Sequence, residues 1–138
     1  MPSVIKSVSF DAADALVLAR FWAAVLGSDV DEDSTIGKAF VEAAGWGGPN
    51  IWFTWVPEPK TAKNRMHFDL RAPGPTDDEV ARLERLGAAV ARRYPDHVVM
   101  ADPEGNESAS SPDPFPADGL LAPAPTDAHA GGRHDGQC

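Results

Sequence analysis

The sequence predicts an α+β fold of two similar βαβββ modules, and three observations lead to that prediction. A Leu-Gly pair occurs twice among the 138 residues, at Leu26-Gly27 and Leu86-Gly87, which are 60 positions apart (86 − 26). Each pair is preceded by an alternating apolar segment and then by a helical pattern of apolar residues. Each pair is also followed by further short apolar segments. A chain with such a repeat usually has a cleft between its two halves.

The first module begins with a predicted strand and helix. Apolar and polar residues alternate from Val4 to Phe10, as they do on a half-buried strand. Asp11 or Asp14 then supplies a helix N-cap, and apolar residues recur at helical spacing. Gly27 predicts the end of this helix, because glycine adopts the left-handed conformation at low cost.

The rest of the first module has the pattern of a hairpin followed by a linker. Segments 38–44 and 50–56 are predicted strands, joined by the glycine-rich turn 45–49. The acidic segment 29–36 is expected to hold at most a short strand. Segment 57–64 contains two prolines and polar side chains, which predicts an extended connection to the second module.

The second module repeats this order from Arg65 onward. Thr76 and Glu79 have the spacing of a capping box at the start of a second helix. Two short strands are expected at 89–93 and 97–101, and each segment ends before turn residues. The second half of the chain therefore predicts the same elements in the same order as the first.

The end of the second module departs from the repeat. Residues 102–105 read Asp-Pro-Glu-Gly, which predicts a turn, and an apolar strand is expected to follow. The chain instead reads Ser-Ala-Ser-Ser-Pro from Ser108, a composition that favours loss of the last strand of the second sheet. An exposed sheet edge is then expected, covered for example by a partner.

The C-terminal part of the chain has a different composition from the rest. Residues 112–138 are rich in proline and glycine, and such a segment buries too little apolar surface to offset its ordering entropy. We expect a disordered tail there. The folded domain is then residues 1–111, with modules at about 1–57 and 65–111.

Charge and composition exclude several classes of function. The net charge is −9, which disfavours binding to nucleic acid or to an anionic membrane surface. No run of 18 apolar residues is present, so no membrane span is expected. Cys138 is the single cysteine, which excludes an intramolecular disulfide and a cysteine-based zinc site. With no secretion signal evident, a cytoplasmic location is expected.

Several local strings, taken together with the repeat, resemble the vicinal oxygen chelate superfamily, which includes glyoxalase I, extradiol dioxygenases and bleomycin-resistance proteins. The strings are Ala19-Arg20-Phe21-Trp22, Leu26-Gly27, Val56-Pro57-Glu58-Pro59-Lys60, Lys63 to Leu70, Leu86-Gly87-Ala88 and Ala101 to Glu107. The resemblance implies a glyoxalase-like domain, with mixed sheets that curl around a shared cavity, often within a homodimer.

Metal-using members of that superfamily carry ligands early and late in each module. The resemblance places these positions at Ser7, at His67, near Thr54 and near Ala109. Only His67 is an effective ligand for a divalent ion, and Asp69 adds at most a second donor. We therefore expect no metal and no other cofactor. His97, His129 and His134 are expected to be incidental, with His97 exposed.

One strand face of the second module carries the main catalytic candidates. His67, Asp69 and Arg71 alternate with apolar residues, so they share a face of the predicted strand. In a functional interpretation, His67 is a general base or a ligand-gripping donor, and Asp69 orients it or pairs with Arg71. In a structural interpretation, the same side chains form a polar face held by internal hydrogen bonds and ion pairs.

The remaining candidates are ligand-binding residues. Trp52 and Thr54 share one face of the aromatic strand and suit a cavity wall for a planar ligand. The predicted ligand-binding set is Ser7, Trp52, Thr54 and Arg71. The basic cluster Lys60, Lys63 and Arg65 either recognises an anionic group or neutralises nearby Glu58, Asp69 or Asp102.

Three functional hypotheses follow from these residues. The first is a glyoxalase-like protein that binds a small organic molecule between the modules without a metal. The second is a lyase or isomerase of the same superfamily that uses His67 as an acid or base. The third is a non-catalytic domain that serves in dimeric assembly. The expected partners are a small-molecule ligand and a second copy of the chain.

Overall fold

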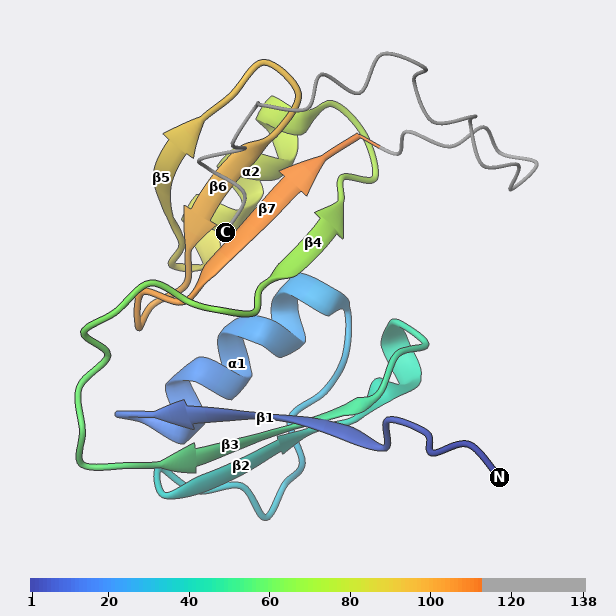
Figure 1. Cartoon of the computed structure of the whole chain (residues 1–138), viewed down its shortest axis with the longest axis vertical. Helices are drawn as coiled ribbons and strands as arrows, with labels where there is room; N and C mark the ends of the chain where they lie inside the picture. The colour runs from blue at the N-terminus through green and yellow to red at the C-terminus, as the bar shows by residue number, and fades with distance from the viewer. Residues whose placement is uncertain (113–138) are drawn as a thin grey trace.

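A computed structural model describes residues 1–112, and these residues form two stacked modules, each of a helix and a sheet (Figure 1). The predicted tail, apart from its first residue, lies outside the described residues. The first module comprises β1 (Ser7–Ala12), α1 (Ala15–Leu26), β2 (Lys38–Val41), a 3-10 turn η1 (Ala43–Gly45) and β3 (Asn50–Trp55). The second comprises β4 (Phe68–Arg71), α2 (Thr76–Leu86), β5 (Ala89–Arg93), β6 (Val98–Ala101) and β7 (Glu107–Ser111). The α+β prediction is confirmed.

Each module has its own mixed sheet, and the two sheets have equivalent topologies. The strand orders are β1-β3-β2 and β4-β7-β6-β5, with the first strand of each module at an edge and parallel to the last. The strand expected within 29–36 is reduced to one bridge between Val30 and Val41. Because β1 and β4 are both edge strands, the two sheets do not close into one within the described residues.

The last strand of the second sheet is present, so the expectation that it is lost is wrong. Glu107–Ser111 pairs with β6 on one side and with β4 on the other. Its small polar side chains are compatible with this position because the backbone supplies the ladder hydrogen bonds whatever the side chains. Because β7 lies between β4 and β6, the exposed sheet edge that we expected from its loss does not form there.

Helix boundaries follow the local signals in α1 but not at the start of α2. The Asp14 carboxylate accepts a hydrogen bond from the Val17 N–H (3.0 Å), and Gly27 ends α1 with φ of +66°. The expected capping box of α2 is absent, since Pro75 occupies the N-cap position and makes no side-chain cap hydrogen bond. Glu79 is instead buried and pairs with Arg82 at 2.9 Å.

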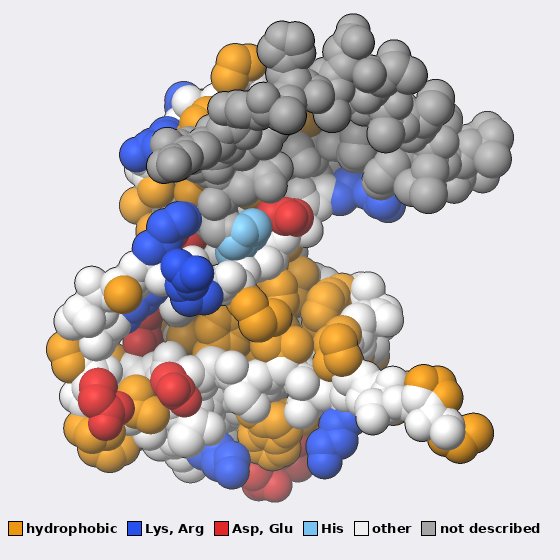
Figure 2. Space-filling model, viewed as in Figure 1, with side chains coloured by type: hydrophobic (Ala, Val, Ile, Leu, Met, Phe, Trp, Pro, Cys, Tyr) orange, Lys and Arg blue, Asp and Glu red, His pale blue; other side chains and the backbone are white. Residues whose placement is uncertain are grey.

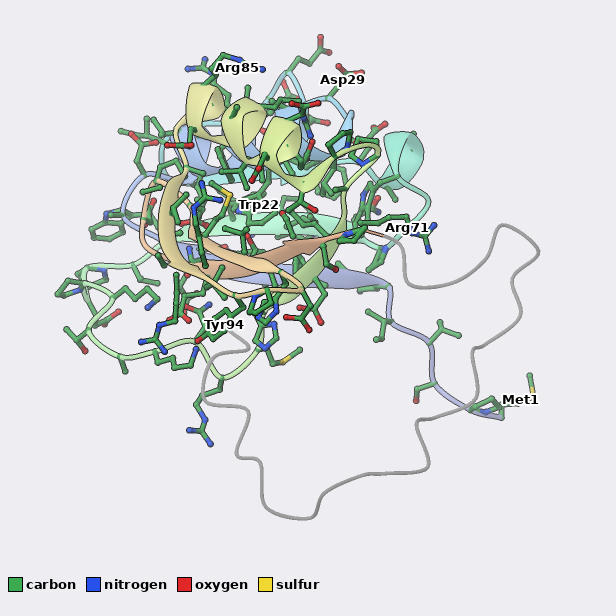
Figure 3. All side chains as sticks on the ribbon, turned by 90° about the horizontal axis from the view of Figure 1, so that it is seen from above. Met1, Trp22, Asp29, Arg71, Arg85 and Tyr94 are labelled. Carbon is green, nitrogen blue, oxygen red and sulfur yellow. The ribbon has the colours of Figure 1, made fainter. Side chains whose placement is uncertain are left out.

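The modules share one hydrophobic core. Leu18 and Phe53 of the first module belong to the same buried cluster as Leu83 and Met100 of the second. Trp22 of α1 is 1% exposed and lies in the interior between the helices and the sheets (Figure 3). Among the described residues, no helix has the length and apolar character needed to cross a membrane.

Candidate functional site

A cleft of about 850 Å³ lies between the two modules. Its walls come from β1, the linker after β3, the first residues of β4 and the turn that precedes β7. Figure 2 shows hydrophobic side chains gathered in the hollow between the modules, with basic and histidine side chains above them. The cleft lies where the repeat predicted one, between the two edge strands that begin the modules.

Three aromatic side chains form the apolar floor of this cleft. Phe10 of β1, Trp22 of α1 and Phe68 of β4 all line it. The Phe10 and Phe68 rings are 5.6 Å apart between centroids, and the Trp22 and Phe68 rings are 5.2 Å apart. Phe10 and Phe68 are only half-buried. An apolar surface is therefore accessible at the junction of the two modules.

The turn before β7 fixes one wall of the cleft to the core. Asp102 is 5% exposed, and its Oδ2 accepts hydrogen bonds from Trp22 Nε1 (3.0 Å) and from Asn106 Nδ2 (2.9 Å). Its Oδ1 accepts hydrogen bonds from the N–H groups of Glu104 and Asn106, each at 2.9 Å. A buried carboxylate with four donors is well satisfied, so the turn is held rigidly against α1.

The second module also supplies charge to both ends of α1. The Glu104 carboxylate accepts hydrogen bonds from the N–H groups of Ala13 (2.6 Å) and Asp14 (3.0 Å) at the helix N-terminus. Arg82 donates to the C-terminal carbonyl oxygens of Ala24 (3.3 Å) and Val25 (3.0 Å). Both charges complement the helix dipole, and α1 has no acid in its first turn or base in its last.

The carboxylate of Glu79, which was expected to belong to a capping box, instead holds the Arg82 side chain in place. Its Nε and one terminal nitrogen donate to Glu79 at 3.1 Å and 2.9 Å, and the hydrogen bond raises the pKa of the guanidinium above its ordinary value. Arg82 therefore stays charged and bridges α2 to the end of α1.

His67 is the member of the predicted site set that lines the cleft. It immediately precedes β4, and its side chain is 21% exposed. Its Nδ1 lies 3.2 Å from Asp69 Oδ1, so the two catalytic candidates are brought into contact. Donation from Nδ1–H to Asp69 leaves Nε2 as the basic nitrogen of the ring.

The predicted ligand-binding residues lie outside this cleft. Ser7 begins β1 and pairs with Asn50. Trp52 contacts Phe40, with 4.5 Å between ring centroids, and belongs with Thr54 to the central strand of the first sheet. Arg71 ends β4 and projects away from the body of the molecule (Figure 3). Trp52 instead lines a smaller hollow over β2.

Two other predictions about individual residues need correction. Lys63 pairs with Glu107 at 2.5 Å, and not with any of the carboxylates named from the sequence. His97, which was expected to be exposed, has a side chain only 13% exposed. It stacks on Tyr94 with 4.5 Å between ring centroids, and its Nδ1 lies 2.6 Å from Asp96.

Comparison with known proteins assigns this architecture to a family. A family model described as a glyoxalase-like domain matches residues 7–109. The chain therefore belongs to the glyoxalase-like domain family. The resemblance inferred from the sequence strings is confirmed. A comparison with curated proteins gives no match.

Solved structures of the same fold come from several bacteria. A glyoxalase/bleomycin resistance protein/dioxygenase family enzyme from Burkholderia phytofirmans has a TM-score of 0.61 and 18% identity, covering 78% of this chain and 96% of its own. The fosfomycin resistance protein FosX from Mesorhizobium loti has a TM-score of 0.61 and 13% identity, covering 80% and 92%. Lactoylglutathione lyase from Agrobacterium tumefaciens has a TM-score of 0.55 and 19% identity, covering 81% and 95%.

The metal that the superfamily implies does not fit the side chains at the corresponding positions. Ser7, Thr54 and Ala109 provide no strong donor, and His67 faces Asp69 as its hydrogen-bond partner. Within residues 1–112, no group of three or more His, Cys, Asp or Glu side chains is arranged to hold a metal ion. A stable divalent site needs three or four such donors, so this donor set is too small.

Sequence reasoning missed the residues of the turn and linker that line the cleft. Asn64, Glu104, Asn106 and Glu107 all contribute to its walls, next to Lys60 and Arg65, which the sequence had already offered as a site for an anionic group. The available signal was the polar string from Asp102 to Glu107, which predicts a turn and contributes to the family resemblance but had no role assigned in binding. Its pairing with α1 and with the linker depends on contacts between residues more than 40 positions apart.

Proposed function

We propose that this protein binds a small organic molecule in the cleft between its modules and does so without a metal. The observation that carries the proposal is the cleft itself, with an accessible aromatic floor and a polar rim. Apolar pockets with a few polar groups are the usual form of small-molecule sites. The weak donor set at the family's metal positions supports the metal-free part.

A thermal-shift screen of small molecules, repeated on a variant whose cleft is narrowed, tests the proposed site. Small aromatic compounds should raise the melting temperature of the protein, because a ligand that binds only the folded state stabilises it. Ser9 is exposed and lines the cleft, so Ser9→Trp should narrow the cleft and remove this effect. Ser3→Trp is the matched control, since Ser3 is exposed and is not among the lining residues.

Two results would contradict the proposal. The binding part fails if no compound stabilises the protein, or if Ser9→Trp and Ser3→Trp respond alike. The metal-free part fails if protein purified without chelator contains nickel, zinc, iron or manganese in stoichiometric amount.

The contact between His67 and Asp69 favours a second candidate, an enzyme that moves a proton. A histidine oriented by a carboxylate at the wall of a cleft has the arrangement of a general base. In this case the protein removes a proton from a carbon next to a carbonyl group of the bound molecule. His67 Nε2 accepts that proton and returns it to the same or a neighbouring atom.

Exchange of carbon-bound hydrogen in D₂O tests this candidate without a known substrate. Dihydroxyacetone and related small carbonyl compounds should lose their α-proton NMR signals faster with the protein than without it. His67→Ala should abolish the acceleration and leave the melting temperature nearly unchanged. His97→Ala is the matched control outside the cleft. If His67→Ala mainly lowers the melting temperature, the residue is structural.

A further inference from the structure

The linker that forms one wall of the cleft carries three basic side chains, and only one of them has a carboxylate partner. Lys63 pairs with Glu107 at 2.5 Å. Lys60 donates to the carbonyl oxygen of Ala62, and neither Lys60 nor Arg65 has an ion pair with any residue of the described chain. Both line the cleft, so two uncompensated cations lie on its linker wall.

The acidic side chains of the same cleft are largely committed elsewhere. Glu107 is neutralised by Lys63, and Glu104 is held by two backbone N–H groups of the first module. Asp11 and Glu58 are the remaining carboxylates of the lining. Together with Glu104, which stays charged, they leave three lining carboxylates outside the Lys63–Glu107 pair against Lys60 and Arg65. The preference for an anion therefore depends on the position of the two cations on the linker wall and not on the net charge of the cleft.

The cationic wall meets the aromatic floor within a single cleft. The half-buried Phe10 and Phe68 offer a surface for a planar apolar group, with the buried Trp22 packed behind them. Arg65 and Lys60 present donors suited to a carboxylate, which arginine binds through two parallel hydrogen bonds. Building on the proposed function, we propose that the cleft selects aromatic monocarboxylates, with the ring on the floor and the carboxylate at Lys60 and Arg65.

Three naphthalene probes of the same size separate charge from shape. These are 2-naphthoate, 2-naphthalenemethanol and 2-naphthylmethylammonium, which are anionic, neutral and cationic at neutral pH. The dissociation constant, measured by isothermal calorimetry at low salt, should be smallest for 2-naphthoate. Added salt should weaken this preference, because Lys60 and Arg65 are exposed and screened by ions.

Variants that remove one positive charge from the linker test whether Lys60 and Arg65 cause the preference for 2-naphthoate. Arg65→Gln and Lys60→Gln should each weaken 2-naphthoate binding about tenfold, the size expected for loss of a charge-assisted hydrogen bond. Binding of 2-naphthalenemethanol should stay the same in both variants. Lys38→Gln is the matched control, because Lys38 is an exposed lysine on β2 that is not part of the cleft.

The outcomes distinguish this inference from the proposed function on which it rests. If the three probes bind with equal affinity, or if the linker variants bind 2-naphthoate as the unmodified protein does, selection of carboxylates is overturned while the cleft stands as a binding site. If no probe binds and no compound stabilises the protein in the wider screen, both proposals fail.

Discussion

Trp22 connects the floor of the cleft to the turn that forms its wall. Its ring packs against Phe10 and Phe68, and its Nε1–H donates to the buried carboxylate of Asp102 at 3.0 Å. The partner of its nitrogen lies 80 positions further along the chain, so no local pattern indicates it. A single buried side chain thus supports the two rings of the cleft floor and makes a buried hydrogen bond to the turn.

Loss of that hydrogen bond has a measurable cost. Trp22→Phe should lower the free energy of unfolding by about 1–3 kcal/mol beyond the cost of the smaller ring, because one buried donor to a carboxylate disappears. Urea unfolding gives the value. Trp46→Phe is the control, since Trp46 Nε1 is buried without a hydrogen-bond partner. Equal losses in the two variants would mean that the Asp102 bond contributes nothing.

Among the elements, β7 shows why composition misled the sequence prediction. Ser108 and Ser110 lie in register with Phe68 and Leu70 of β4, and both serines are buried. A strand between two partners obtains its backbone hydrogen bonds from them, so it tolerates small polar side chains that an isolated segment would not. The apolar contacts come from neighbouring strands and from α2, which a local pattern does not record.

The side chain of Ser110 in β7 should lower the stability of the protein. It is fully buried, and its Oγ has no hydrogen-bond partner. Ser110→Ala should raise the free energy of unfolding by about 1 kcal/mol, because an unsatisfied buried hydroxyl is removed. Ser34→Ala should have the opposite sign, since Ser34 Oγ accepts a hydrogen bond from the Phe40 N–H (3.0 Å). Thermal unfolding of both variants checks this, and a destabilised Ser110→Ala would contradict it.

At the scale of the whole molecule, the second module provides the hydrogen-bond partners for both ends of α1. Glu104 binds the N–H groups at one end of the helix, and Arg82 binds the carbonyl groups at the other. The two modules also share one core. The cleft is therefore held between parts that depend on each other for stability, and a ligand that bridges them should stabilise the chain as a unit.

Removal of the Glu104 carboxylate tests this coupling. Glu104→Ala should lower the free energy of unfolding by about 1–2 kcal/mol, because two N–H groups at a helix N-terminus lose their acceptor. Hydrogen exchange at the Ala13 and Asp14 amides should accelerate in the same variant. Glu107→Ala is the comparison variant, since it removes one ion pair to the exposed Lys63 side chain and should leave exchange at Ala13 and Asp14 unchanged. Unchanged exchange at Ala13 and Asp14 would show that Glu104 does not hold the helix end.

The site was less accessible to sequence reasoning than the fold. His67 was identified because the alternating strand pattern around it is a local feature, and its contact with Asp69 follows from a spacing of two residues. Asn64, Glu104 and Asn106 were missed as lining residues because their role arises from the packing of a linker and a turn against another module.

The sequence by itself determined the two-module architecture, through alternating strands, helical stripes and the glycine stops at Gly27 and Gly87. Those signals are local, since strand and helix periods depend on neighbouring residues. Only the tertiary structure decided that Glu107–Ser111 is an interior strand and that the cleft lies between β1, β4, the linker and the turn. The physical reason is that strand pairing, burial of Asp102 and the clamp on α1 all join residues far apart in the chain.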